Sequence, residues 1–151
     1  NAYQASINYD TVDYYLAGEW VKISSSLLVV PKLDSYYLSA GYNFHPFQAH
    51  ITHAVSNSSY GGLVNNIPMG INRQLDALST GLDYVYENLP EYSLDSLTLG
   101  LRWDFRYNMA IKADITLLDG VPGENSFFSD ITDPNFDRKA TLYQIGLEWI
   151  F

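Results

Sequence analysis

Hydrophobic and polar residues alternate with a period of two along most of this chain. In the clearest stretch, Ser96 to Phe105, the odd positions are leucine, tryptophan and phenylalanine, and the even positions are polar residues or glycine. Such alternation is typical of β-strands whose two faces meet different environments. The same pattern recurs over residues 2–9, 13–24, 36–44, 48–55, 109–117 and 141–151. The sequence therefore predicts seven strands of roughly ten residues, a length that crosses a bilayer when the strand is tilted.

The connections between these strands alternate in length. Residues 10–12, 45–46 and 106–108 form short breaks, whereas residues 25–34, 57–93 and 119–138 form long ones. Outer-membrane barrels have short turns on one side of the membrane and long loops on the other. Residues 74–87 fit either a helix or a strand, because their hydrophobic residues match both periods. We expect a short helix here, since an eighth strand would break the alternation of short and long connections.

Both a soluble β-sandwich and a transmembrane barrel would show this alternation, and the residue types favour the barrel. The polar face consists of Gly, Ser, Asn and Gln with a few isolated charges, not the Lys, Glu and Thr typical of a solvated face. Aromatic residues lie at the strand ends of the apolar face, as in the girdles that outer-membrane barrels have at membrane–water interfaces. These rings are Tyr36, Phe44, Trp103, Phe105, Tyr143, Trp149 and Phe151. We predict an all-β, transmembrane, antiparallel up-and-down β-barrel region over residues 1–151.

Composition excludes several other classes of protein. A net charge of −9 with only 8 Lys and Arg argues against a nucleic-acid partner, because phosphates need a basic surface. The absence of cysteine excludes disulfides and thiolate zinc sites. The longest apolar run, Leu27 to Val30, is far shorter than the roughly 20 residues of a transmembrane helix. No leader peptide opens the chain, so we expect any export signal to have been removed or to lie upstream.

Three segments resemble the strands of Gram-negative porins and porin-like proteins: residues 37–44, residues 97–105 and the terminal residues 143–151. The resemblance implies a bacterial outer-membrane location, contact with lipid and lipopolysaccharide, and a homotrimer. Porins have about 16 strands, so this chain would correspond to the C-terminal portion of such a barrel. The resemblance also implies that Tyr143, Trp149 and Phe151 form the signal that the barrel-assembly machinery reads.

If the apolar face meets lipid, the polar face lines a pore. The expected pore-lining residues are Glu19, His50, Arg102, Asp104, Lys112, Asp114, Gln144 and Glu148. Arg102 with Asp104 and Lys112 with Asp114 should be near neighbours across the hairpin that turns at 106–108. Such charges either tune ion selectivity or neutralise one another and hold the wall. Both interpretations require them to face inward, because a charge on the lipid face at mid-bilayer costs roughly 2–4 kcal/mol.

The predicted function is therefore passive diffusion of ions and small polar solutes, with no catalysis, cofactor or bound metal. The alternative is a small eight-stranded barrel with a filled interior and a structural or adhesive role. Catalysis is disfavoured because His50 and His53 are three residues apart on a strand and so point to opposite faces. Five carboxylates in 119–138 lack the spacing of an EF-hand. We expect this loop to be solvated and to bridge divalent cations to lipopolysaccharide, with a dedicated calcium site as the alternative.

Overall fold

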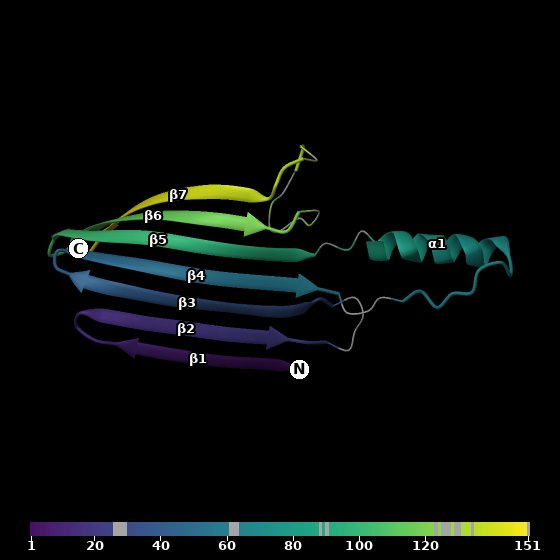
Figure 1. Ribbon diagram of the computed structural model, residues 1–151, viewed down its shortest axis with the longest axis horizontal. Helices are drawn as coiled ribbons and strands as arrows, with labels where there is room; N and C mark the ends of the chain where they lie inside the picture. The colour runs from purple at the N-terminus through teal and green to yellow at the C-terminus, as the bar shows by residue number, and fades with distance from the viewer. Residues whose placement is uncertain are drawn as a thin grey trace.

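Seven antiparallel strands form a single sheet in which each strand pairs with its neighbours in the chain (Figure 1). The computed structural model describes residues 1–25, 30–60, 64–87, 89, 91–122, 124, 128, 131–133 and 135–150. The strands are β1 (Ala2–Asp10), β2 (Tyr14–Ile23), β3 (Lys32–Phe44), β4 (Phe47–Ser59), β5 (Tyr92–Arg106), β6 (Met109–Gly120) and β7 (Lys139–Trp149). This up-and-down order confirms the predicted antiparallel strands. The described sheet does not close on itself, so β1 and β7 form its two edges.

One helix, α1 (Arg73–Glu87), interrupts the β-structure within the connection between β4 and β5. It confirms the expected helix over 74–87 and removes the alternative of an eighth strand there. The side-chain oxygen of Asn72 accepts hydrogen bonds from the backbone amides of Gln74 and Leu75 and so caps the helix. Asn65 ties the preceding segment to α1 by donating to the side chains of Ser79 and Asp83. The helix extends beyond the sheet (Figure 1), and among the described residues it packs against no strand.

The strands extend further toward the long connections than the alternation predicted. β3 already begins at Lys32, β4 continues to Ser59, and β5 begins at Tyr92. The predicted loops at 25–34, 57–93 and 119–138 are therefore too long by two or three residues at four of their six ends, and the end at 138 is correct. The added positions include Asp34 opposite Asn57 and Asp95 opposite Asp119. These four polar side chains lie on the convex face, so backbone pairing continues there where the hydrophobic pattern of that face has already ended.

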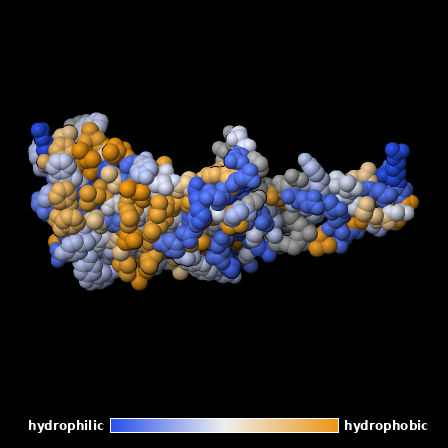
Figure 2. Space-filling view, turned by 45° about the horizontal axis from the view of Figure 1, so that its top comes forward, coloured by the Kyte–Doolittle hydropathy of each residue, from blue (hydrophilic) through white to orange (hydrophobic). Residues whose placement is uncertain are grey.

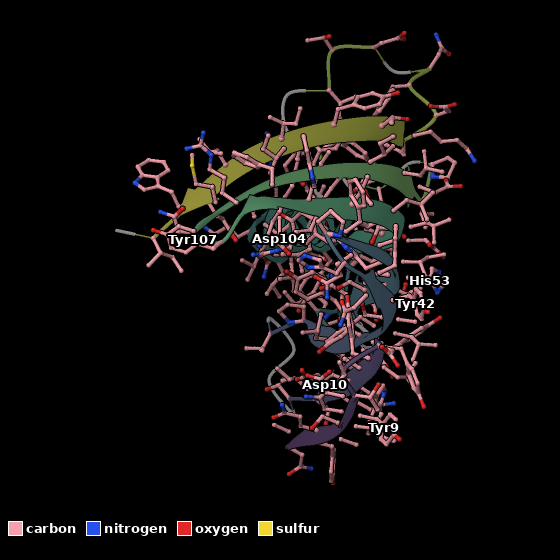
Figure 3. All side chains as sticks on the ribbon, turned by 90° about the vertical axis from the view of Figure 1, so that its left-hand side faces the viewer. Tyr9, Asp10, Tyr42, His53, Asp104 and Tyr107 are labelled. Carbon is pink, nitrogen blue, oxygen red and sulfur yellow. The ribbon has the colours of Figure 1, made fainter. Side chains whose placement is uncertain are left out.

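The sheet curves into a trough (Figure 3), and its two faces differ in chemistry. Tyr9, Tyr42 and His53 lie on the convex side, whereas Asp10 and Asp104 lie on the concave side. The convex face has an exposed hydrophobic band that includes Ile7, Leu38, Ile51, Leu99, Ile115 and Ile145. Among the described residues only Ala110 is a buried hydrophobic residue, so neither face is covered by a second layer.

Different side chains bound the two ends of this convex band. At the end with the short turns, rings touch in an unbroken series of four pairs, Tyr42–Phe44, Phe44–Phe47, Phe47–Trp103 and Trp103–Phe105, with centroids 5.6–6.2 Å apart. At the end with the long connections lies a charged collar, which comprises Lys22, Asp34, Asp95, Asp119 and Lys139. Hydrophobic colour gathers over the strands in Figure 2, and hydrophilic colour over the long connections and α1.

Ion pairs neutralise most of the collar. Lys22 Nζ lies 3.1 Å from Asp34 Oδ2, and Lys139 Nζ lies 2.7 Å from Asp119 Oδ2. The indole nitrogen of Trp20 also donates to Asp34, over 2.9 Å. The collar therefore lies between the hydrophobic band and the polar end of the molecule. Most of its charges are paired, and the ring of Trp20 is apolar while its indole N–H donates a hydrogen bond to the collar.

The contact between Gly41 and Tyr15 on the concave face can be tested by mutation, because the Tyr15 ring lies directly over Gly41. A Cβ at Gly41 would sit 2.1 Å from Tyr15 Cε1, whereas a Cβ at Gly146 would have no atom within 4 Å. Both glycines lie within strands, so replacement by alanine changes strand propensity alike. We expect Gly41→Ala to lower the free energy of unfolding by roughly 1–3 kcal/mol relative to Gly146→Ala. Urea unfolding followed by circular dichroism measures this difference, and equal values would show that Tyr15 does not pack on Gly41.

Candidate functional site

The eight predicted pore-lining residues all lie on the concave face. The strand register places seven of them in adjacent rows on β4, β5, β6 and β7, and places Glu19 apart from these rows on β2. The eight residues are Glu19, His50, Arg102, Asp104, Lys112, Asp114, Gln144 and Glu148. All except Glu19 lie toward the end of the sheet with the short turns. The alternation thus assigned each residue to the correct face, whereas whether this face lines a pore stays a prediction.

Glu148 forms the centre of the charge network. Its carboxylate lies 2.9 Å from Arg102 Nη1 and 2.5 Å from Lys112 Nζ. Arg102 Nε also donates to Asp104 Oδ1 over 2.8 Å. The network joins β5, β6 and β7, so one glutamate on the edge strand β7 compensates one cation on β6 and another on β5.

The charged residues of β5 and β6 are near neighbours across the hairpin, as expected, but like charges rather than opposite charges stand directly opposite each other. The register places Arg102 directly opposite Lys112, and Asp114 opposite Gly100. Two like charges therefore face each other, an arrangement that is destabilising without a third group. A register shift between Trp103 and Arg106 separates Asp104 from the regular pairing with β6. Because Glu148 is 36 residues from Lys112 along the chain, hairpin spacing alone could not identify it as the shared partner.

Gly100 allows a contact between two strands that are not paired with each other. His50 on β4 and Asp114 on β6 both stand opposite Gly100 on β5, and His50 Nε2 lies 3.7 Å from Asp114 Oδ1. A Cβ at Gly100 would meet His50 Cε1 at 1.9 Å and Asp114 Oδ1 at 2.2 Å. The missing side chain is therefore what gives the two groups room to approach over the middle strand.

Hydroxyl groups pair across strands in the middle of the concave face and toward the long connections. The side-chain oxygens of directly opposite residues lie within 2.7–2.9 Å of each other in three pairs. These pairs are Ser35–Ser56, Ser39–Thr52 and Thr98–Thr116. The alternation in the sequence indicates a polar face but not these pairs, since the pairing depends on register. Each hydroxyl thereby satisfies part of its hydrogen bonding within the wall.

A cavity of about 540 Å³ lies beside the charge network at the end with the short turns. Its lining includes His45, Arg102, Asp104, Arg106 and Glu148. Cations and carboxylates thus share one hollow that can hold water and small ions. Within the described ranges, no three His, Asp or Glu side chains are grouped so that they could hold a metal ion.

His50 and His53 lie on opposite faces, as predicted. His50 approaches Asp114 on the concave face, whereas His53 Nε2 lies 2.9 Å from Asp95 Oδ1 on the convex face. Two of the residues predicted to form the assembly signal, Tyr143 and Trp149, are exposed along the convex face of β7. The third, Phe151, lies outside the described residues. The acidic loop over 119–138 is described only in part, and none of the helices described is long and apolar enough to span a bilayer.

Comparison with known proteins found no relative of this chain. No protein-family model matches it, and neither does any curated protein or any solved structure. The porin resemblance therefore depends on the three strand segments of the sequence alone.

The role of Glu148 can be tested through salt dependence. Glu148→Gln leaves Arg102 and Lys112 facing each other without a shared carboxylate, so we expect a lower urea midpoint at low ionic strength. The loss should shrink as NaCl is raised from about 10 mM to about 1 M, where the Debye length falls to roughly 3 Å. The double variant Glu148→Gln/Lys112→Gln removes the repulsion and should recover most of the midpoint. A loss that is independent of salt and persists in the double variant would contradict a bridging role.

Proposed function

We propose that this chain is an outer-membrane β-barrel, or the C-terminal section of one, and acts as a channel for passive diffusion of ions and small polar solutes. The observation that supports this most strongly is the difference between the two faces. The convex face exposes a hydrophobic band, with Leu99 50% and Ile145 85% exposed, while the concave face is polar. A soluble sandwich would bury that band beneath a second sheet.

The height of the hydrophobic band matches that of the apolar band by which outer-membrane barrels cross a bilayer. From Asp34 in the charged collar to Phe44 in the ring series, β3 covers roughly 33 Å at about 3.3 Å per residue. A strand tilt of about 40° reduces this to roughly 25 Å, the height of the apolar band of outer-membrane barrels. The rings at one boundary and Trp20 at the other would lie where aromatic girdles are found.

The open edges favour a section of a larger barrel. Unpaired backbone groups in lipid cost several kcal/mol each, so the edges of β1 and β7 need partners. β1 and β7 run in the same direction, since an even number of strand reversals separates them. Antiparallel closure therefore takes an odd number of further strands, which gives the even total found in bacterial outer-membrane barrels. A barrel of about 16 strands satisfies this condition. The eight-stranded alternative does so only with one strand from outside the described sheet, because residues 73–87 are helical.

Solutes would cross through water along the concave wall. The wall includes both cations and carboxylates, so its net effect on ions depends on which charges remain uncompensated. Lipid and lipopolysaccharide would contact the convex face, whose charged collar would lie at headgroup level. A homotrimer, the bacterial outer membrane and recognition by the barrel-assembly machinery are carried over from the porin resemblance.

Conductance tests the proposal directly. We expect the purified full-length protein, with every strand of its barrel, to form open channels in planar lipid bilayers, and Lys112→Glu to shift the reversal potential in a salt gradient toward cation selectivity. Lys22→Glu, a matched change on the convex face, should leave the reversal potential unchanged. Absence of conductance in the parent protein would refute the channel, and equal shifts in both variants would show that the concave face does not line it.

The orientation of the faces gives a second test. Leu99→Lys places a charge on the convex face, while Leu142→Lys places the same charge on the concave face, one row away and similarly exposed at 45%. We expect Leu99→Lys to lower the free energy of unfolding in lipid vesicles by roughly 2–4 kcal/mol and Leu142→Lys to cost far less. The reverse order would mean that lipid contacts the concave face.

A further inference from the structure

A groove of about 340 Å³ on the concave face lies near the long connections, away from the charge network. Its volume is within the range of small-molecule sites. It is lined by Glu19, Val21, Tyr37, Ala54, Leu94 and Ser96, among others. Of these residues, the small ones come from β4 and β5, and the larger apolar ones come from β2, β3 and β5.

The groove is unusual for the polar face because it is largely apolar. Val21, Tyr37, Ala54 and Leu94 occupy positions of a face on which most other residues are Gly, Ser, Thr, Gln or charged. A wall that only conducts water and ions has no need of such a patch, and exposed apolar surface costs free energy in water. The patch is suited to an apolar group of a solute.

Glu19 provides the polar contact of the groove. Gln4 Nε2 donates to Glu19 Oε1 over 2.7 Å and holds the carboxylate in place. Among the described residues, no Lys, Arg or His forms an ion pair with Glu19, whereas Asp104 and Glu148 on the same face each pair with Arg102 and Asp114 lies beside His50. Tyr37 stands directly opposite Glu19, so an aromatic ring and an uncompensated carboxylate border the same space.

We propose that this groove binds small organic cations that carry an apolar group, such as an arylalkyl ammonium. The ammonium would bond to Glu19 and contact the Tyr37 ring, while the apolar group would cover Ala54 and Leu94. This proposal names a solute class for the channel, and to that extent it rests on the proposed function. Binding itself requires only the groove.

Charge favours a cation over an anion at this position. The chain has a net charge of −9, which raises the local concentration of cations. Arg102 and Lys112 already share Glu148, and they lie roughly 20 Å further along the strands, at about 3.3 Å per residue. An anion in the groove would therefore meet Glu19 without a cationic group to compensate it.

Titration of the purified protein with 2-phenylethylammonium chloride, followed by calorimetry, tests this binding. Three probes separate its parts: 2-phenylethanol lacks the charge, ethylammonium lacks the ring, and 3-phenylpropionate reverses the charge. We expect 2-phenylethylammonium to bind most tightly. Glu19→Gln should weaken it about tenfold, in keeping with a hydrogen bond to a charged group. Glu87→Gln, at the end of α1, is the matched control and should leave the affinity unchanged.

A second variant keeps the test valid if Glu19→Gln does not fold. Tyr37→Leu preserves the apolar bulk but removes the ring, and should weaken binding by about threefold. Equal affinity in the parent protein and in the folded variants, or equal affinity for 3-phenylpropionate, would overturn the proposal. Conductance measured on the same preparation distinguishes the two proposals: conductance without binding refutes only the groove, and binding without conductance refutes only the channel.

Discussion

The antiparallel hydrogen-bond ladder is the constraint on which the rest of this structure depends. Because side chains alternate across a strand, pairing seven strands in one register sends every even or odd position of a strand to the same face. A slip of one residue in any pair would move a whole strand's hydrophobic residues to the other face. The exposed convex band, the charge network and the groove all exist only in this register.

The concave face changes in character along the strands. Near the short turns it carries charged side chains, and Glu148 compensates the charges of Arg102 and Lys112. In the middle it contains paired hydroxyls such as Thr98 and Thr116. Near the long connections it contains the apolar groove with Glu19. In the proposed channel a solute would thus meet an apolar binding surface at the loop side and mixed charges at the turn side. The two ends of the wall would act on different properties of the solute.

The convex face also changes along the strands, and different side chains end its hydrophobic band on the two sides. Touching rings end the hydrophobic band near the short turns, and paired charges end it near the long connections. Pairing matters here because an isolated charge at the border of an apolar surface would lose hydration without compensation. The collar and the rings therefore delimit the band at both ends, and ion pairs compensate most of the charge in the collar.

The sequence by itself determined which face each strand residue occupies, because a period of two needs no knowledge of neighbouring strands. It placed all eight concave-face residues correctly and favoured a helix over 74–87 from the length of the connections. Only the tertiary structure decided which residues stand beside one another across strands. Pairing depends on turn geometry and on the irregularity between Trp103 and Arg106, and it brings together residues as distant as Lys112 and Glu148. The close approach of His50 and Asp114 over Gly100 likewise required three strands in register, since a missing side chain acts only through what its neighbours place above it.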